Sequence, residues 1–72
     1  MKQYEYRVFR DDPYLGSVKE DLFMQNWANK HGENGWHFFK IEWEVYRNYR
    51  DEDRYISIFA VGCRELTGSP YR

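Results

Sequence analysis

The segment 54–65 is the part of this chain that most limits how it can fold. Its residues from Tyr55 to Cys63 form the most continuous apolar run in the sequence, interrupted only by a serine and a glycine. A strand with apolar side chains on both faces usually lies in the middle of its sheet and is covered on both sides. We therefore expect a central strand at 54–65.

Two further segments have the alternation of apolar and polar side chains that is typical of strands. In residues 3–10, the apolar side is formed by Tyr4, Tyr6 and Val8. One expected face of residues 36–46 is apolar, with Phe39, Ile41, Trp43 and Val45. The other expected face of that strand is charged, with Lys40, Glu42 and Glu44. The charged loop 47–53 is expected to connect the second and third strands as a hairpin.

A helix is expected between the first two strands, from about residue 18 to residue 31. Ser17 and Glu20 have the spacing of a capping box, in which the hydroxyl and the carboxylate each satisfy a free backbone N–H at the helix start. Gly32 follows the last helical residue, so we expect it to take the left-handed conformation that commonly ends a helix.

The order strand, helix, strand, strand leaves few topologies. The crossover through one helix, which is expected to be right-handed, makes the first two strands run in the same direction, and the hairpin makes the third antiparallel to the second. With the third strand central, the prediction is an α+β fold of β-α-β-β order. The sheet is expected to be mixed, in the order 1-3-2, with the helix packed on one face. One small domain is expected to cover 1–66, followed by a short tail at 67–72.

Three short blocks resemble a family of small bacterial and phage proteins, domain of unknown function family 4177. They are Tyr4 to Val8 (YEYRV), His31 to Trp36 (HGENGW) and the apolar strand from Ile56 to Arg64. The family usually has Leu where this chain has His31, and Glu where it has Asn34. The resemblance implies the same strand–helix–strand–strand fold and a bacterial or phage origin, but it implies no activity.

Charge and composition exclude several classes of protein. The 11 basic and 12 acidic residues give a formal charge of −1, without the basic excess of most nucleic-acid-binding domains. The same balance argues against a polybasic protein bound to a membrane surface. No apolar run is long enough for a membrane-spanning helix, and the first residues lack the apolar core of a signal peptide. We expect a cytoplasmic protein that does not bind membranes.

Residues that often carry chemistry are present but do not form a known motif. His31 and His37 have no third ligand nearby in the sequence, and a single cysteine, Cys63, lies in the most apolar strand. The acidic run 51–53 lacks the alternating oxygen ligands and central glycine of a calcium loop. We therefore expect no enzyme activity, no catalytic residue, no metal, no cofactor and no small-molecule substrate.

The most unusual feature of the composition is its aromatic content, 21% of all residues. A domain of this size has a thin core, so we expect some rings to stay outside as a contact surface for another protein. The most economical partner is a second copy of the chain, which predicts a homodimer. The expected contact residues are Tyr46, Tyr49, Arg50 and Tyr55, with Trp36 and Trp43 as anchors if the sheet is exposed there. The open face would carry either the side of Tyr4 and Tyr6 or the side of Glu5 and Arg7.

An alternative function uses the same region differently. Arginines and tyrosines near the 47–55 hairpin would form an edge on which single-stranded nucleic acid binds, with bases stacked on rings and phosphates held by guanidinium groups. That edge requires Arg7, Arg47, Arg50, Arg54 and Arg64 to lie near Tyr49 and Tyr55. The interleaved acidic residues act against such binding.

Overall fold

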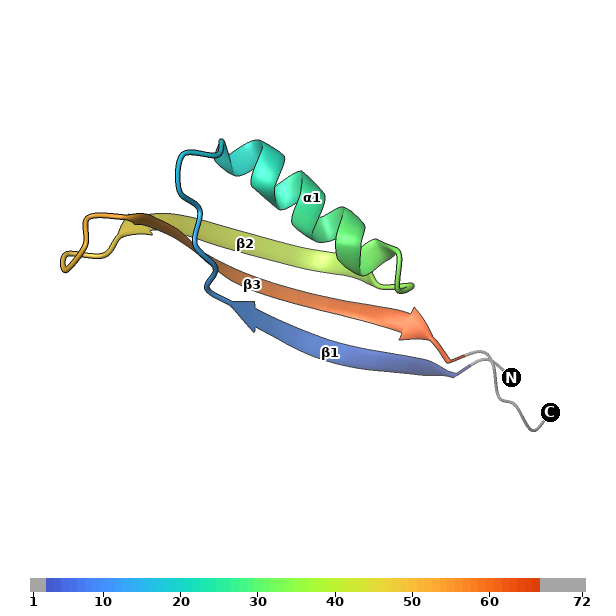
Figure 1. Cartoon of the computed structure of the whole chain (residues 1–72). Helices are drawn as coiled ribbons and strands as arrows, with labels where there is room; N and C mark the ends of the chain where they lie inside the picture. Colours follow the sequence, from blue (N-terminus) through green and yellow to red (C-terminus); the bar gives the residue numbers. More distant parts are fainter. Residues whose placement is uncertain (1–2, 67–72) are drawn as a thin grey trace.

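The computed structural model describes residues 3–66 and contains three strands and one helix. In chain order these are β1 (Tyr4–Asp11), α1 (Glu20–Gly32), β2 (His37–Arg47) and β3 (Arg54–Glu65). The expected β-α-β-β order is confirmed, and the helix crosses one face of the sheet (Figure 1). The expected tail at 67–72 lies outside the described residues.

The sheet has the expected strand order, with β3 between β1 and β2. Both neighbouring pairs are antiparallel, so the expectation of a mixed sheet was wrong in that detail. The reason is that β1 and β2 do run in the same direction, but β3 separates them and no parallel pair forms. The apolar run of β3 thus has the predicted central place.

The helix begins later than the capping box predicted. Its N-cap is Lys19, in an extended conformation and without a side-chain capping bond, so Ser17 does not cap it. The preceding loop is instead attached to β3: the backbone N–H groups of Leu15 and Gly16 donate to the carbonyl of Arg54 at 2.8 and 3.2 Å. Leu15 is buried there, and this long-range anchoring overrides the local capping signal.

The helix also ends differently from the prediction. Gly32 is the last helical residue and Glu33 follows it in the right-handed region, so Gly32 does not have the left-handed role expected for it. Gly35 has that conformation instead, with φ of 90°. The turn at Gly35 directs the next residue, Trp36, into the core, where it is 5% exposed.

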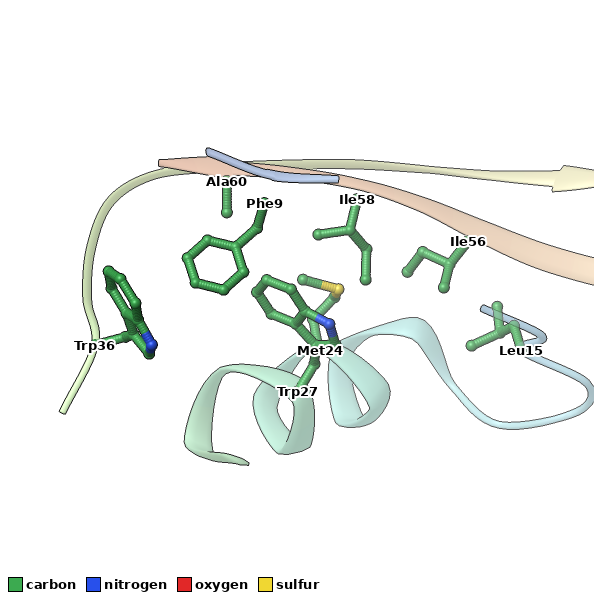
Figure 2. Close-up of a cluster of buried hydrophobic side chains, with 8 residues drawn as sticks. All are labelled: Phe9, Leu15, Met24, Trp27, Trp36, Ile56, Ile58 and Ala60. Atoms are coloured by element: carbon green, nitrogen blue, oxygen red, sulfur yellow. The ribbon is translucent and has the colours of Figure 1, made fainter. Parts of the chain in front are cut away.

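The core lies between α1 and the face of the sheet that the helix covers (Figure 2). It consists of eight buried apolar residues: Phe9, Leu15, Met24, Trp27, Trp36, Ile56, Ile58 and Ala60. The ring of Phe9 meets those of Trp27, Trp36 and Phe38 edge to face, at centroid distances of 6.0, 5.1 and 5.1 Å. Each such ring pair adds about 0.5–1.5 kcal/mol to the gain from buried area.

A β-bulge at the start of β2 changes which side chains face the helix. Phe38 pairs with Gly62 and Lys40 pairs with Val61, so Phe39 is the extra residue between them. Phe38 therefore packs against the core, whereas Phe39 is 62% exposed. The predicted apolar face of β2 holds from Ile41 onward, but it is wrong for Phe39 because one inserted residue shifts the alternation.

Two glycine substitutions test this description. A methyl group on Gly62 would lie 2.8 Å from the carbonyl oxygen of His37 and 2.9 Å from the ring of Phe38, so we expect Gly62→Ala to lower the free energy of unfolding by about 1–3 kcal/mol. Nothing lies near Gly32, so Gly32→Ala should raise it by about 0.5–1 kcal/mol. Urea unfolding followed by circular dichroism measures both. A loss of stability in Gly32→Ala would contradict the helical conformation of Gly32.

Candidate functional site: the open face of the sheet

The face of the sheet opposite the helix is uncovered, and the register defines which side chains it carries. In β3 the even-numbered positions from Ile56 to Gly62 are buried under the helix, and the odd-numbered ones alternate with them. Residues directly opposite in antiparallel strands point to the same side of a sheet. The open face therefore has successive rows across the strands, namely Tyr6–Cys63–His37, Val8–Val61–Lys40, Arg10–Phe59–Glu42 and, at the hairpin, Tyr14–Tyr55–Tyr46.

One half of the open face is an exposed apolar patch. Tyr6, Val8 and Phe39 have exposed fractions of 68%, 53% and 62%. The rings of Tyr6 and Phe39 lie edge to face with centroids 6.5 Å apart, which places Phe39 on the same side as Tyr6. We call apolar patch the set of Tyr4, Tyr6, Val8, Phe39, Phe59, Val61 and Cys63. Contiguous apolar surface of this kind is typical of interaction sites.

The exposure of Tyr6 and Val8 shows which side of β1 is open. The side of Tyr4 and Tyr6 faces solvent, and the side of Glu5 and Arg7 lies on the helix side with Phe9. The alternation of β1 did not reveal this, because only Phe9 on the more polar side is buried. Phe9 therefore determines the orientation of the strand, and its place among polar neighbours is the signal in the sequence that identifies the open side.

Charged groups border the apolar patch next to Phe59. The guanidinium of Arg10 lies 4.9 Å from the centroid of the Phe59 ring, and the ammonium of Lys40 lies 5.9 Å from it. Glu42 is paired with Lys40 at 3.6 Å. Beyond Phe59, two shallow hollows of about 340 Å³ each meet at the small side chain of Ser57. The middle of the open face thus has Arg10 on the β1 side of β3 and the ion pair of Lys40 and Glu42 on the β2 side.

Tyrosines gather on the open face near the hairpin. The rings of Tyr46 and Tyr55 are stacked 5.8 Å apart, and Tyr14 meets Tyr55 edge to face at 5.6 Å. The Tyr46 hydroxyl lies 2.7 and 2.8 Å from the two carboxylate oxygens of Asp12, and this hydrogen bond is the main cause that raises the pKa of Tyr46. Burial, and then Asp51, raise the pKa of Tyr55. These three rings form the tyrosine cluster.

The six expected contact residues are therefore divided among three places. Tyr46 and Tyr55 lie together in the tyrosine cluster on the open face. Tyr49, with an exposed fraction of 86%, and Arg50 lie in the hairpin loop, where the Arg50 N–H donates to the Asn48 side chain at 2.8 Å.

Trp36 and Trp43 lie on the helix side of the sheet, where Trp36 is buried and Trp43 is 40% exposed. Trp36 is buried between the guanidinium groups of Arg7 and Arg64, 4.8 and 4.7 Å from its ring. Glu5 is paired with both arginines, at 3.5 and 3.0 Å. The indole of Trp43 donates to Glu20 at 3.1 Å.

The five arginines of the alternative nucleic-acid edge are divided: Arg47, Arg50 and Arg54 belong to the hairpin that carries Tyr49 and Tyr55, and the other two do not. Arg7 and Arg64 surround Trp36, where Arg64 also donates to the Asn34 carbonyl next to the helix end. Arg54 donates to the Gly16 carbonyl at 2.9 Å, and Arg47 donates to that of Glu52 at 2.9 Å. Arg64, Arg54 and Arg47 thus each donate to a backbone carbonyl and help to hold the folded backbone together.

The residues considered for catalysis or metal binding are placed apart. Cys63 lies on the open face opposite His37, whereas His31 lies on the helix side among the rings of Phe9, Trp27 and Phe38. Within residues 3–66, no group of three or more His, Cys, Asp and Glu side chains is placed to hold a metal ion. In the same part of the chain, no helix has the length and apolarity needed to cross a membrane.

Comparisons with known proteins give no relative for this chain. No family model matches it, and no curated protein or solved structure does so. The block HGENGW, which carries part of the family resemblance, has a structural role: Gly35 makes the turn and Trp36 fills the core.

The position of His31 predicts a pH dependence of stability. Burial is the main cause that lowers the pKa of His31 from 6.5; Lys30 and, to a smaller extent, Arg7 act in the same direction, and Asp11 opposes them. A depressed pKa means that the unfolded chain binds the proton more readily, so this contribution is fully present above pH 6.5 and is lost as the pH falls below it.

The variant His31→Phe keeps a ring and removes the titration. The free energy of unfolding of the wild type, relative to His31→Phe, should decrease as the pH is lowered below about 6.5. Chemical unfolding at a series of pH values measures this difference. Parallel pH profiles of the two proteins would show that His31 is not the responsible group.

Proposed function

We propose that this protein is a small, non-enzymatic protein-interaction module that self-associates through the open face of its sheet. The observation that carries the proposal is the one-sided placement of Tyr6, Val8 and Phe39, each more than half exposed on the face that the helix does not cover. The apolar patch is the primary contact. The tyrosine cluster, together with Tyr49 and Arg50 of the hairpin loop, is a secondary contact at the hairpin end.

The shape of the molecule supports this proposal. Its radius of gyration is 15.3 Å, against about 11 Å for a compact domain of the same length, and its extents are 52 × 19 × 17 Å. A long sheet covered on one face leaves the other face in water. Aromatic side chains are enriched at protein interfaces, where they bury a large area at a low cost in conformational entropy.

The charge placement supports a protein partner more than a nucleic acid. Near the hairpin the open face carries Asp12, Glu42 and Glu44, which repel phosphates, and Arg47 and Arg54 are engaged by backbone carbonyls. We expect no binding of a labelled single-stranded oligonucleotide at moderate salt. Binding with a steep salt dependence would favour the nucleic-acid alternative, because phosphate contacts release counterions.

The proposal is tested by placing a charge in the apolar patch. The wild type should sediment as a dimer, and Phe39→Lys should weaken the dimer at least about tenfold, because a charged ammonium would be buried in the contact. Leu22→Lys is the matched control: Leu22 is 52% exposed but lies on the helix, so the dimer should persist. Sedimentation equilibrium measures both, and circular dichroism checks that each variant folds.

Two results would contradict the proposal. The first is a wild-type protein that stays monomeric at concentrations of about 100 µM, because even a weak specific dimer would be populated at that concentration. The second is an equal loss of association in Phe39→Lys and Leu22→Lys, which would show that the loss is not specific to the open face. Tyr49→Ala should have a smaller effect than Phe39→Lys, since the hairpin loop provides the secondary contact.

A further inference from the structure

The row Arg10–Phe59–Glu42 has opposite charges on the two sides of the central strand. Arg10 of β1 and Glu42 of β2 are each paired directly with Phe59 of β3. Both side chains are exposed, and among residues 3–66 Arg10 contacts the Phe59 ring but forms no ion pair. Within this row the charge is therefore basic at Arg10 and acidic at Glu42, and Lys40 of the neighbouring row is paired with Glu42 at 3.6 Å.

Such a pattern is complementary to itself under one particular symmetry. Two open faces that pack with aligned strands are related by a twofold axis between the sheets. If the axis runs parallel to β3, strand β1 of one copy lies over β2 of the other. Every row then lies opposite the same row of the second copy. Arg10 then lies opposite Glu42 of the second copy, twice by symmetry, and the two Phe59 rings meet at the axis.

The other aligned arrangement lacks this complementarity. A twofold axis perpendicular to the strands reverses the order of the rows and places β2 over β2. To superpose the apolar patch on itself, that axis must pass through the row Val8–Val61–Lys40. Lys40 then lies against Lys40 of the second copy, and the row of Arg10 and Glu42 faces the row of Tyr6 and His37. The charges thus favour the axis parallel to β3.

We infer that the open face binds a second copy of this chain about a twofold axis parallel to β3, and that Arg10 and Glu42 select this partner. The inference rests on the proposed function and adds the arrangement and the selecting residues. Complementary charges of this kind determine specificity and register more than affinity, and the apolar patch provides the binding energy. The same overlay places Asp12 opposite Glu44 of the second copy, so the hairpin ends lie less close than the apolar patches.

Charge exchange between two variants tests the selecting pair. In Arg10→Glu, each of the two cross-dimer contacts joins two acidic side chains, and in Glu42→Arg each joins two basic ones. The like charges repel, so each homodimer should weaken at least about tenfold. An equimolar mixture of the two variants should form a heterodimer, because each contact then joins a glutamate to an arginine. The double variant R10E/E42R should dimerise like the wild type. Native mass spectrometry distinguishes the heterodimer from both homodimers by mass.

A second measurement uses the single cysteine as a reporter of the axis. Cys63 lies on β3, so the axis parallel to β3 places it opposite Cys63 of the second copy. Packed sheets are about 10 Å apart, which is too far for a disulfide but within the span of a short bis-maleimide. The wild type should therefore be cross-linked to a covalent dimer in high yield. Phe39→Lys, which breaks the dimer, should not be.

The outcomes separate this inference from the proposed function. Lys19→Glu changes the net charge as Arg10→Glu does but lies at the helix N-cap, so its dimer should be unaffected. If Phe39→Lys dissociates the dimer but the mixed variants form no heterodimer, the twofold arrangement is wrong and the open-face contact stands. Absence of the Cys63 cross-link in a dimeric wild type also overturns the arrangement. A monomeric wild type overturns both.

Discussion

The structure depends most on the burial of one ring, that of Phe9. It is the single buried side chain of β1, and it contacts rings from the helix, from β2 and from the turn before β2. Through these contacts Phe9 attaches an edge strand to the core and determines which side of that strand faces the helix. The tyrosines of β1 lie outside as a consequence, so the packing of the core and the composition of the open face have the same cause.

Much of the fold follows from sequence patterns that act over several residues. The apolar run of β3 predicted its central place, and the order of segments predicted the topology. Single-residue signals were less reliable. Ser17 does not cap the helix because β3 anchors the loop before it, and Gly32 is helical because Gly35 makes the turn. Local chemistry offers several sites for a cap or a turn, and long-range contacts select among them.

The candidate site was predicted only in part. The sequence indicated that some rings must stay outside, and Tyr46 and Tyr55 do lie together on the open face. It did not place Phe39 there, because pairing with β3 creates the bulge and no local pattern marks it. It also did not show that Trp36 would be enclosed by Arg7 and Arg64, since these residues are distant in the sequence.

The bulge of β2 has a consequence for how such a chain can change during evolution. Phe39 is an additional residue whose neighbours Phe38 and Lys40 already alternate correctly between the two faces. Its deletion would restore regular pairing and remove a phenylalanine from the outer surface, with every core side chain left in place. A single codon gained or lost at this position therefore changes the apolar area of the outer surface and keeps the pairing register of the core side chains.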